Sequence, residues 1–412
     1  MNKTPIMILD QQSWRGGGQR VLGNVLTSLE EDFEATVVFP DRGPFQKELQ
    51  DRGYETLIHP LGSYSPGAKP AREKAAFTLR TVLCALRLSR AMMARKSALV
   101  YVNGARCLPF GVAAAWLTGK PVLFHLHNAL SRRSDIALVS WLSRYVSKII
   151  VCSNAAADCL LRSCPKLRSK IVLVRNCVHP APENAQPAAL DEGPSHGPQF
   201  TVGIVGRITE DKGHHILLQA VTRLSPEIKP HLRLLFVGGP GPECPKDEAY
   251  VQRLKSLARE LALEERIVWT GHQLDLEPYY RQMDAVAIPS TAREGGGPTM
   301  VALEAMQRGL PVIVSGCGGN AECLRDGVNA LVVPPGDDDA LAIALRRVFE
   351  DSALRERLAS AARQTIDQQF SPLVFSARIR RLVSEVCVPV RNLEPARKIA
   401  RQHERSNQEL LP

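Results

Sequence analysis

The stretch GIVGRITEDKG, residues 203–213, joins a short apolar strand to a helix and places two cations at the junction. Residues 201–205 are mostly β-branched and end at Gly206, and apolar residues recur at helical spacing after the stretch. Strand, loop and helix in this order predict one unit of a parallel α/β sheet. In such sheets ligands bind beyond the carboxyl ends of the strands, which is where Arg207 and Lys212 fall.

The two cations suit a phosphorylated ligand. A guanidinium offers a planar fork of donors and an ammonium is a compact charge. Together they fit a diphosphate that gains negative charge as a bond to it breaks. For this segment alone, two solvated loop cations are the competing interpretation, and the rest of the chain has to decide between them.

The alternation of strand and helix continues through most of the chain. Short apolar runs are separated by loops rich in Gly, Pro, Ser and Asn. The sequence therefore predicts an α/β protein with two Rossmann-like, doubly wound domains that face each other across a cleft. Strands are expected at residues 6–9, 35–39, 56–59, 99–102, 122–126, 149–152, 171–174, 201–205, 232–237, 266–269, 285–288, 311–314 and 330–333, and helices at 43–52, 73–96, 214–224, 247–262, 276–282, 298–308, 321–324, 337–349 and 352–369.

The domain organisation follows from length and from one stretch of breakers. A chain of 412 residues is too long for one ordinary core. The segment PAPENAQPAALDEGPSHGP, residues 180–198, has no periodicity and is the best candidate linker. The predicted parts are an N-terminal domain (1–180), a linker (181–199), a C-terminal domain (200–370), a helix that packs back toward the N-terminal domain (371–387) and a polar tail (388–412).

The net charge of +10 is carried by the first half of the chain. Residues 1–199 hold 25 Lys or Arg against 15 Asp or Glu, whereas residues 200–412 hold 27 of each. Residues 69–175 alone carry 19 basic residues and three acids. Such a field attracts an anionic membrane surface, an anionic substrate or nucleic acid. Nucleic acid is disfavoured, because this half is poor in aromatic residues and has no recognised reading motif.

The helix expected at residues 73–96 is both apolar and basic. Leu79, Val82, Leu83 and Leu86 are predicted to point inward. The residues predicted to point outward are Arg80, Arg87, Arg90, Arg95 and Lys96. A solvated basic face is the simplest interpretation, and an acceptor-binding or membrane-facing surface is the alternative.

Cysteine usage and hydropathy indicate a reduced, cytoplasmic protein. The ten cysteines include no CxxC pair and fall in apolar segments, so we expect them to pack as small hydrophobic side chains. The N-terminal MNKTPIMILDQQ holds an apolar piece of strand length only, and no run of about 18 or more uncharged apolar residues occurs. His125 and His127 alternate on one strand with no third ligand nearby, and no metal site is expected.

Two further features fall at strand ends. Gly16, Gly17 and Gly18 precede a helix, and a glycine-rich turn at a helix start exposes backbone N–H groups to an anion. A flexible surface turn is the equal alternative. His127 follows the strand at 122–126 and there can contact a sugar hydroxyl or position an acceptor.

With these motifs in order, the chain resembles the GT-B glycosyltransferases of family 4, a retaining group that uses nucleotide-sugar donors. The resemblance runs from about residue 5 to about residue 385. Several spaced motifs in the family's order are more specific than any one of them. They are GGGQRV (16–21), GRITEDKG (206–213), VGGPGPE (237–243), EGGGPTMVALEA (294–305) and RDGVNALVVPPGD (325–337).

The resemblance implies catalytic roles for some of these residues. Arg207 and Lys212 match the pair that holds the donor diphosphate and stabilises it as the leaving group. His127 matches a histidine near the transferred sugar. Gly16 and Gly17 match the loop whose amides close over the distal phosphate. The N-terminal domain would then be the acceptor side and the C-terminal domain the donor side.

The resemblance also implies further donor-binding residues. Glu304 matches the second glutamate of the family's E-x7-E motif, which accepts hydrogen bonds from the ribose hydroxyls, a good chemical fit for a carboxylate. The turn of Gly271 and His272 matches the backbone that borders the base, and Gly206 begins the diphosphate loop.

One departure from the family pattern concerns the first glutamate of that motif. Counting back eight residues from Glu304 gives Gly296, and the nearest acid is Glu294, ten residues back. Either the glycine-rich loop bulges and Glu294 still reaches the sugar, or amides of Gly296 and Gly297 replace the contact. The identity of the transferred sugar depends on this residue.

The expected function is transfer of a hexose-type sugar from a UDP- or GDP-sugar to a saccharide or lipid-linked acceptor, with retention. The setting implied is bacterial surface polysaccharide synthesis, lipopolysaccharide or exopolysaccharide, with peripheral contact at the inner, anionic membrane face. A soluble small acceptor is the second choice. No metal or cofactor is expected, since relatives generally need none. The alternative is a module that binds nucleotide sugars without efficient transfer.

Overall fold

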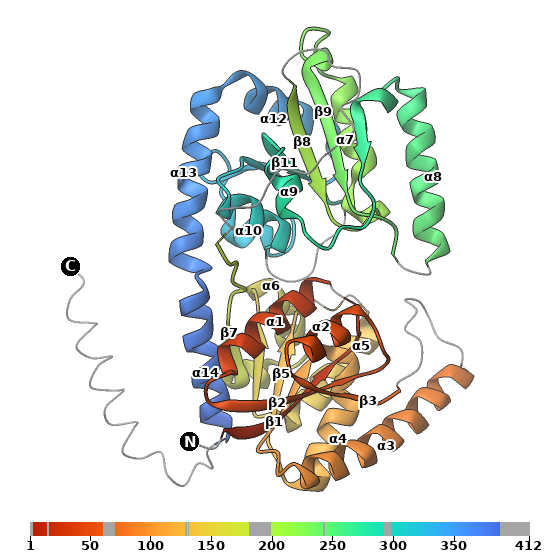
Figure 1. Cartoon of the computed structure of the whole chain (residues 1–412), viewed down its shortest axis with the longest axis vertical. Helices are drawn as coiled ribbons and strands as arrows, with labels where there is room; N and C mark the ends of the chain where they lie inside the picture. The colour runs from red at the N-terminus through yellow and green to blue at the C-terminus, as the bar shows by residue number, and fades with distance from the viewer. Residues whose placement is uncertain are drawn as a thin grey trace, which may run out of the picture. The chain divides into compact units, whose positions relative to one another are not determined.

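The computed structural model describes residues 3–14, 16–60, 71–127, 130, 132–180, 199–241, 244–291 and 298–387, and for residues 71–75 the backbone alone. The packing of Cα atoms divides the chain into two compact units, each built around parallel β-strands and helices (Figure 1). The first unit comprises Met1–His125, Trp141–Ile150 and Ser376–Pro412, and the second comprises Leu126–Ser140 and Val151–Phe375. The domain and linker boundaries named above remain predictions.

The first sheet has seven strands in the order β3-β2-β1-β4-β5-β6-β7. Strand β1 lies between β2 and β4 and pairs with both in parallel. The strands are β1 (Thr4–Asp10), β2 (Phe33–Phe39), β3 (Glu55–Ile58), β4 (Val100–Asn103), β5 (Val122–Leu126), β6 (Lys148–Val151) and β7 (Ile171–Leu173). The helices between them are α1 (Gly17–Leu29), α2 (Pro44–Asp51), α3 (Ala71–Ala94), α4 (Leu108–Thr118), α5 (Arg133–Leu142) and α6 (Asn154–Ser163).

The second sheet has six strands in the order β10-β9-β8-β11-β12-β13, with parallel pairing throughout. Its strands are β8 (Phe200–Val205), β9 (Leu232–Val237), β10 (Ile267–Trp269), β11 (Ala285–Ile288), β12 (Val312–Ser315) and β13 (Leu331–Val333). Its helices are α7 (His214–Thr222), α8 (Pro245–Glu260), α9 (Glu277–Tyr280), α10 (Met300–Gln307), α11 (Asn320–Cys323), α12 (Asp338–Glu350) and α13 (Ser352–Gln369), and α14 (Pro372–Cys387) follows.

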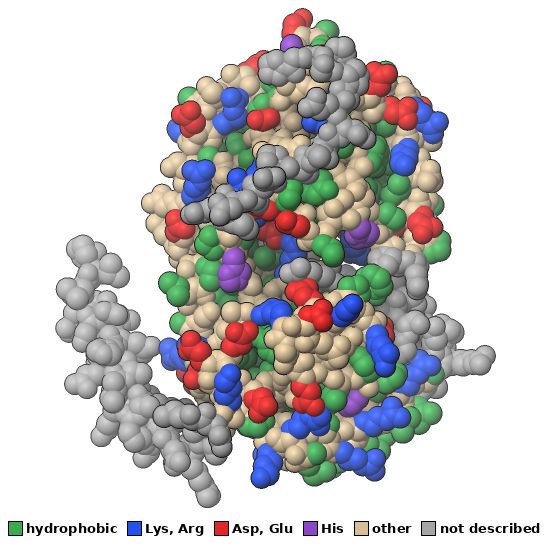
Figure 2. All heavy atoms as spheres, in the orientation of Figure 1, with side chains coloured by type: hydrophobic (Ala, Val, Ile, Leu, Met, Phe, Trp, Pro, Cys, Tyr) green, Lys and Arg blue, Asp and Glu red, His purple; other side chains and the backbone are tan. Residues whose placement is uncertain are grey.

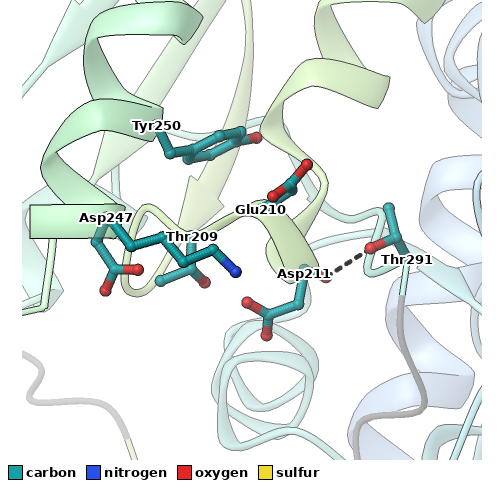
Figure 3. Close-up of a pocket in the computed structure, with 7 residues that line it drawn as sticks. Thr209, Glu210, Asp211, Asp247, Tyr250 and Thr291 are labelled. Atoms are coloured by element: carbon teal, nitrogen blue, oxygen red, sulfur yellow. Dashed lines mark hydrogen bonds between the residues drawn. The ribbon is translucent and has the colours of Figure 1, made fainter. Parts of the chain in front are cut away.

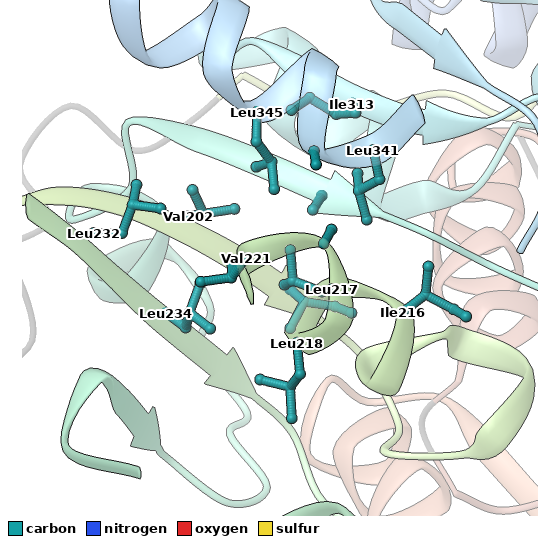
Figure 4. Packing of buried hydrophobic residues seen from close by; sticks show 14 of the residues in the cluster. Val202, Ile216, Leu217, Leu218, Val221, Leu232, Leu234, Ile313, Leu341 and Leu345 are labelled. Atoms are coloured by element: carbon teal, nitrogen blue, oxygen red, sulfur yellow. The ribbon is translucent and has the colours of Figure 1, made fainter. Parts of the chain in front are cut away.

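Both faces of the second sheet are buried, as a doubly wound fold requires. On β9, Leu234 and Phe236 belong to one apolar cluster, whereas Leu235 and Val237 belong to another. Because successive side chains of a strand point to opposite faces, the two clusters cover the two sides of the sheet. The first cluster includes residues of α7 and α12, such as Leu217, Val221, Leu341 and Leu345 (Figure 4).

The expected fold class is confirmed, and most expected elements lie within two residues of their observed bounds. One interpretation was wrong. The apolar residues predicted to face inward on α3, namely Leu79, Val82, Leu83 and Leu86, are exposed. The buried face instead carries Cys84, Ala85, Leu88, Ser89 and Met92. Helical periodicity alone could not choose between the two faces, because both are rich in apolar residues.

The strand order reverses at β1 in the first sheet and at β8 in the second sheet. The chain moves outward from β1 to β2 and β3, then returns past β1 to β4, and the second sheet repeats this from β8. Loops that leave such neighbouring strands diverge to opposite sides and open a crevice at their carboxyl ends. The glycine turn at 16–18 follows β1, and the loop with Arg207 and Lys212 follows β8.

Candidate functional site

The loop after β8 is held by backbone hydrogen bonds to the strand beside it. Gly206 N donates to Val237 O at 2.9 Å, and Ile208 N donates to Gly239 O at 2.8 Å. A one-turn 3₁₀ helix, Glu210–Lys212, completes the loop before α7 begins. Arg207 between these bonds is exposed, and Lys212 is partly buried. The structure therefore places both predicted cations on one loop whose backbone is fixed.

Close backbone packing fixes the end of this loop. Gly213 has φ of +72°, and a Cβ there would lie 1.9 Å from the carbonyl oxygen of Pro289, directly after β11. Thr291 N also donates to Asp211 O at 2.9 Å. The loop after β8 and the loop after β11 therefore touch, and only glycine fits at the contact.

Glu304 lies on α10, where a network of partly buried and buried groups orients it. The hydroxyl of Tyr280 donates to Glu304 Oε2 at 3.0 Å. The guanidinium of Arg308 stacks 4.6 Å from the centroid of the Tyr280 ring. Arg308 Nε in turn donates to Glu277 Oε2 at 2.8 Å, and Glu277 is buried. Sequence reasoning found Glu304 but missed Tyr280, Glu277 and Arg308, because no local pattern links α9 to α10.

The turn of Gly271 and His272 lies beside the end of β9. Gly271 pairs with Gly238 in an isolated antiparallel bridge. The exposed His272 ring places Nε2 3.0 Å from Pro240 O, which makes Nε2 the protonated ring nitrogen. Gly271 has φ of +67°, a conformation that glycine adopts without strain. The structure thus brings this turn to the same sheet edge as the loop after β8.

His127 directly follows β5 and belongs to the second unit. The residue is partly buried, and desolvation of its ring lowers its pKa to about 4, so the imidazole is neutral near pH 7. The thiol of Cys152 donates to the His127 carbonyl oxygen, with 3.1 Å between Sγ and O. A neutral imidazole can both donate and accept one hydrogen bond, which suits a sugar hydroxyl.

The glycine turn of the first unit is anchored to a buried carboxylate that the sequence did not single out. Asp10, the last residue of β1, accepts hydrogen bonds from Gln12 N at 3.0 Å, Gln19 Nε2 at 2.8 Å and Asn103 Nδ2 at 2.8 Å. Gln19 Oε1 accepts from Gly16 N at 3.2 Å. Burial raises the Asp10 pKa to about 6, although the hydrogen bonds oppose this. The sequence does contain a signal for this residue, because Asp10 is an acid that ends an otherwise apolar strand.

Some predicted site residues lie outside the described residues, and others belong to the first unit. Glu294, Gly296 and Gly297 lie outside the described residues, so neither alternative for the first glutamate is decided. Gly16 and Gly17 belong to the first unit, whereas Arg207, Lys212 and Glu304 belong to the second.

A small polar pocket of about 280 Å³ adjoins the loop after β8 (Figure 3). It lies between the turn at Glu210 and the start of α8, and Arg207 and Lys212 do not line it. Among the described residues that line it, Glu210, Asp211 and Asp247 carry carboxylates and Lys246 carries an ammonium. This charge balance does not suit a diphosphate, so the pocket is distinct from the predicted donor site.

The cysteines, the potential metal ligands and the helix hydropathy of the described residues add no further site. All ten cysteines are free thiols, and all but Cys244 and Cys387 are buried. Among residues the structure describes, no group of three or more His, Cys, Asp or Glu is arranged to hold a metal ion. No described helix combines the length and apolar character required to cross a bilayer.

Comparison with known proteins assigns the family. Residues 15–181 match the model described as Glycosyltransferase Family 4, and residues 187–365 match the model described as Glycosyl transferases group 1. The chain belongs to the GT-B glycosyltransferases of family 4. The two matches between them contain every residue of the candidate site described above except Asp10 and Gln12.

Curated relatives of this family 4 chain include a D-inositol 3-phosphate glycosyltransferase of Stackebrandtia nassauensis, 34% identical over 170 residues. Another is the lipopolysaccharide core biosynthesis glycosyltransferase LpsE of Rhizobium meliloti, 32% identical over 167 residues. Each match covers 40% of this chain, and the matches span only 37% and 44% of the two relatives' own length.

Solved structures share the fold over a longer stretch. HepE of Anabaena, solved in complex with UDP and glucose, superposes with a TM-score of 0.78 over 92% of this chain and 99% of its own, at 23% identity. The apo lipopolysaccharide outer core galactosyltransferase WaaB gives a TM-score of 0.68 over 93% of this chain and 99% of its own, at 19% identity. At these identities the likeness establishes the GT-B fold.

Proposed function

We propose that the protein transfers a hexose-type sugar from a nucleoside-diphosphate sugar to a saccharide or lipid-linked acceptor, with retention at the anomeric carbon. The reaction would belong to the synthesis of bacterial surface polysaccharide, either lipopolysaccharide or exopolysaccharide. Retention rests on the sequence resemblance to the family.

The observation that carries the proposal is the loop of Arg207 and Lys212. It leaves β8, the strand at which the order of the second sheet reverses, and backbone bonds to β9 and contact with Pro289 fix its path. As the bond to the sugar breaks, the departing diphosphate gains negative charge. Two cations on a fixed loop stabilise that charge without having to reorganise, which is electrostatic catalysis of the leaving group.

The other side chains of the second unit fit the remaining parts of a nucleotide sugar. The Glu304 carboxylate can accept from both ribose hydroxyls, and the hydrogen bond from Tyr280 limits its rotation. A neutral His127 can hydrogen-bond the transferred sugar. The turn of Gly271 and His272 offers backbone groups to the base. For Gly16 and Gly17, contact with the distal phosphate stays a prediction.

The donor and the setting are supported by relatives. HepE was solved with UDP and with UDP-glucose, and LpsE and LpsD of Rhizobium meliloti are named as lipopolysaccharide core glycosyltransferases. A UDP- or GDP-sugar is therefore the proposed donor, and a lipid-linked or anionic saccharide at the inner membrane face is the first choice of acceptor. We propose no metal or cofactor, because Arg207 and Lys212 supply two positive charges for the diphosphate.

A screen of nucleotide sugars tests the proposal. The expected result is a rise in the unfolding temperature with one nucleoside-diphosphate sugar, together with slow hydrolysis of that donor in the absence of acceptor. Tight binding with no turnover against any acceptor would instead support a binding module. No thermal shift with any nucleotide sugar, and no hydrolysis, would remove the proposed function.

A further inference from the structure

Helix α3 carries a row of exposed apolar side chains that the fold of its own unit does not use. The row consists of Leu79, Val82, Leu83, Leu86 and Met93, spaced i, i+3, i+4, i+7 and i+14, so it follows one face of the helix. Leu79 is 63% exposed and Met93 is 61% exposed. Exposed apolar side chains gathered on one helix face of a folded protein are characteristic of a surface that contacts something else.

Exposed apolar side chains also lie at the end of α4, the helix that packs against α3. Trp116 is 79% exposed, and Leu117 beside it is also exposed. The hydroxyl of Thr118 lies 4.0 Å from the sulfur of Met92, so the carboxyl ends of α3 and α4 lie together. Hydrophobic side chains and Lys or Arg side chains are interspersed over this part of the first unit (Figure 2). We call the α3 row together with Trp116 and Leu117 the apolar stripe.

Among the described side chains, the exposed charges beside the apolar stripe on α3 and just after α4 are basic, although Arg95, which follows α3, is paired with Glu55. Arg80, Arg87 and Arg90 of α3 are exposed, and exposed Lys120 follows α4. Residues 76–120 contain seven Lys or Arg and no Asp or Glu. Arginines next to an apolar row can lay their stems on it and place their charged heads at its margin.

We propose that the apolar stripe docks on the surface of an anionic phospholipid bilayer, with α3 parallel to the membrane plane. Leucine, valine and methionine would enter the boundary between headgroups and acyl chains, while the arginines meet lipid phosphates. Trp116 is suited to the level of the headgroups. A second copy of the chain is the rival occupant, but a symmetric pairing of this surface would bring the arginines of two copies together. An anionic bilayer offers acyl chains to the apolar side chains and phosphates to the arginines.

Vesicle flotation with the full chain tests the proposal. The probes are vesicles of phosphatidylcholine with phosphatidylglycerol, and vesicles of phosphatidylcholine alone, each at low and raised salt. The variants are Leu79→Gln with Leu83→Gln, which keeps good helix formers, and Arg80→Gln with Arg87→Gln and Arg90→Gln. The matched control is Ile343→Gln with Arg346→Gln and Arg347→Gln on α12, an exposed apolar and basic face of the other unit.

The intact protein is expected to float with the anionic vesicles at low salt and to be released as salt rises. The leucine variant should lower the partition coefficient about tenfold, and each arginine replaced should lower it about fivefold at low salt. The control variant should bind like the intact protein.

Two results would overturn the docking surface. One is the absence of binding to anionic vesicles at low salt, and the other is an equal loss of binding in the control variant. Light scattering that shows dimers abolished by the leucine variant, without vesicle binding, would assign the stripe to a second copy. Thermal shift with nucleotide sugars should be the same in all variants, so this test fails or succeeds independently of the proposed function.

Discussion

The phenolic hydroxyl of Tyr280 donates a hydrogen bond to the Glu304 carboxylate at 3.0 Å, and the Tyr280 ring is fully buried beneath the Arg308 guanidinium. The bond joins α9 to α10 and sets the direction of the carboxylate proposed to receive the ribose. Tyr280 is therefore a positioning residue, since it acts on the nucleotide through Glu304.

Replacing Tyr280 with phenylalanine should weaken nucleotide binding while keeping the stacking on Arg308. A hydrogen bond to a charged group is worth about 1.5–3 kcal/mol, so we expect the dissociation constant of the nucleoside diphosphate to rise by roughly tenfold or more. Isothermal titration measures this. Tyr279→Phe, one residue away and without a bond to Glu304 in the described part, should leave the constant unchanged. Equal constants in the two variants would refute the positioning role.

Lys212→Ala should lower turnover at saturating donor by about 10² to 10³, the cost of losing one group that stabilises developing negative charge. The KM for the donor should change less, because the interaction is strongest once the bond to the sugar has broken. Lys246→Ala is the control, since Lys246 lines the neighbouring polar pocket. Nearly full turnover in Lys212→Ala would exclude Lys212 from the leaving-group site.

Gly213→Ala should destabilise the second unit by about 3 kcal/mol or more, because the new Cβ would adopt positive φ and also collide with Pro289. Gly327→Ala separates these effects. Gly327 has φ of +67° but no atom within 4 Å of an added Cβ. That control should cost only about 1 kcal/mol, from the backbone alone. Urea denaturation gives both values, and equal losses would show that the contact with Pro289 is not tight.

Gly17→Ala should leave stability within about 0.5 kcal/mol of the parent, since a Cβ there meets no atom within 4 Å. If Gly17 lets its backbone approach the distal phosphate, turnover should nonetheless fall by about tenfold or more. The same helix offers Gly23→Ala as a control, which also meets no atom and should gain about 0.5–1 kcal/mol from the lower entropy of the unfolded chain. Unchanged turnover in Gly17→Ala would remove the glycine turn from the donor site.

Acid should destabilise the fold in part through His214. Burial lowers the pKa of this histidine from 6.5 to about 3, and its ring packs edge-on against Phe236 at 5.2 Å. Between those two pKa values the unfolded chain binds a proton at this position and the folded chain does not. Stability from this group is therefore present above about pH 6.5 and is lost as the pH falls through that window.

His214→Leu should make the fall in unfolding free energy with acid less steep, by up to about 5 kcal/mol over the window. Urea denaturation at a series of pH values measures the slope. His231→Gln should leave it as in the parent, because His231 is exposed. A slope unaltered by His214→Leu would show that protonation of this ring is not coupled to unfolding.

Local sequence patterns were sufficient for most of the fold. Runs such as 122–126, 232–237 and 285–288 became strands with those bounds, because they are largely apolar, too short for a typical helix and followed closely by Asn, Gly or Pro. The loop of Arg207 and Lys212 was placed at a carboxyl strand end for the same reason. The order of these units along the chain predicted two doubly wound sheets.

Contacts between distant residues were not accessible in that way. The Tyr280, Arg308 and Glu277 network and the bond from Asn103 to Asp10 join residues 24 to 93 positions apart, and no periodicity encodes such pairs. Helix α3 shows the same principle for a surface. Its spacing identified an apolar row, but only packing against α4 decided that a different face is buried.

The sequence by itself determined the two α/β halves, the positions of their loops and the family, because these depend on local spacing and on the order of motifs. Only the tertiary structure decided which carboxylates are held and by what, and which face of α3 is left to solvent. Those outcomes depend on partners that folding brings together from distant parts of the chain.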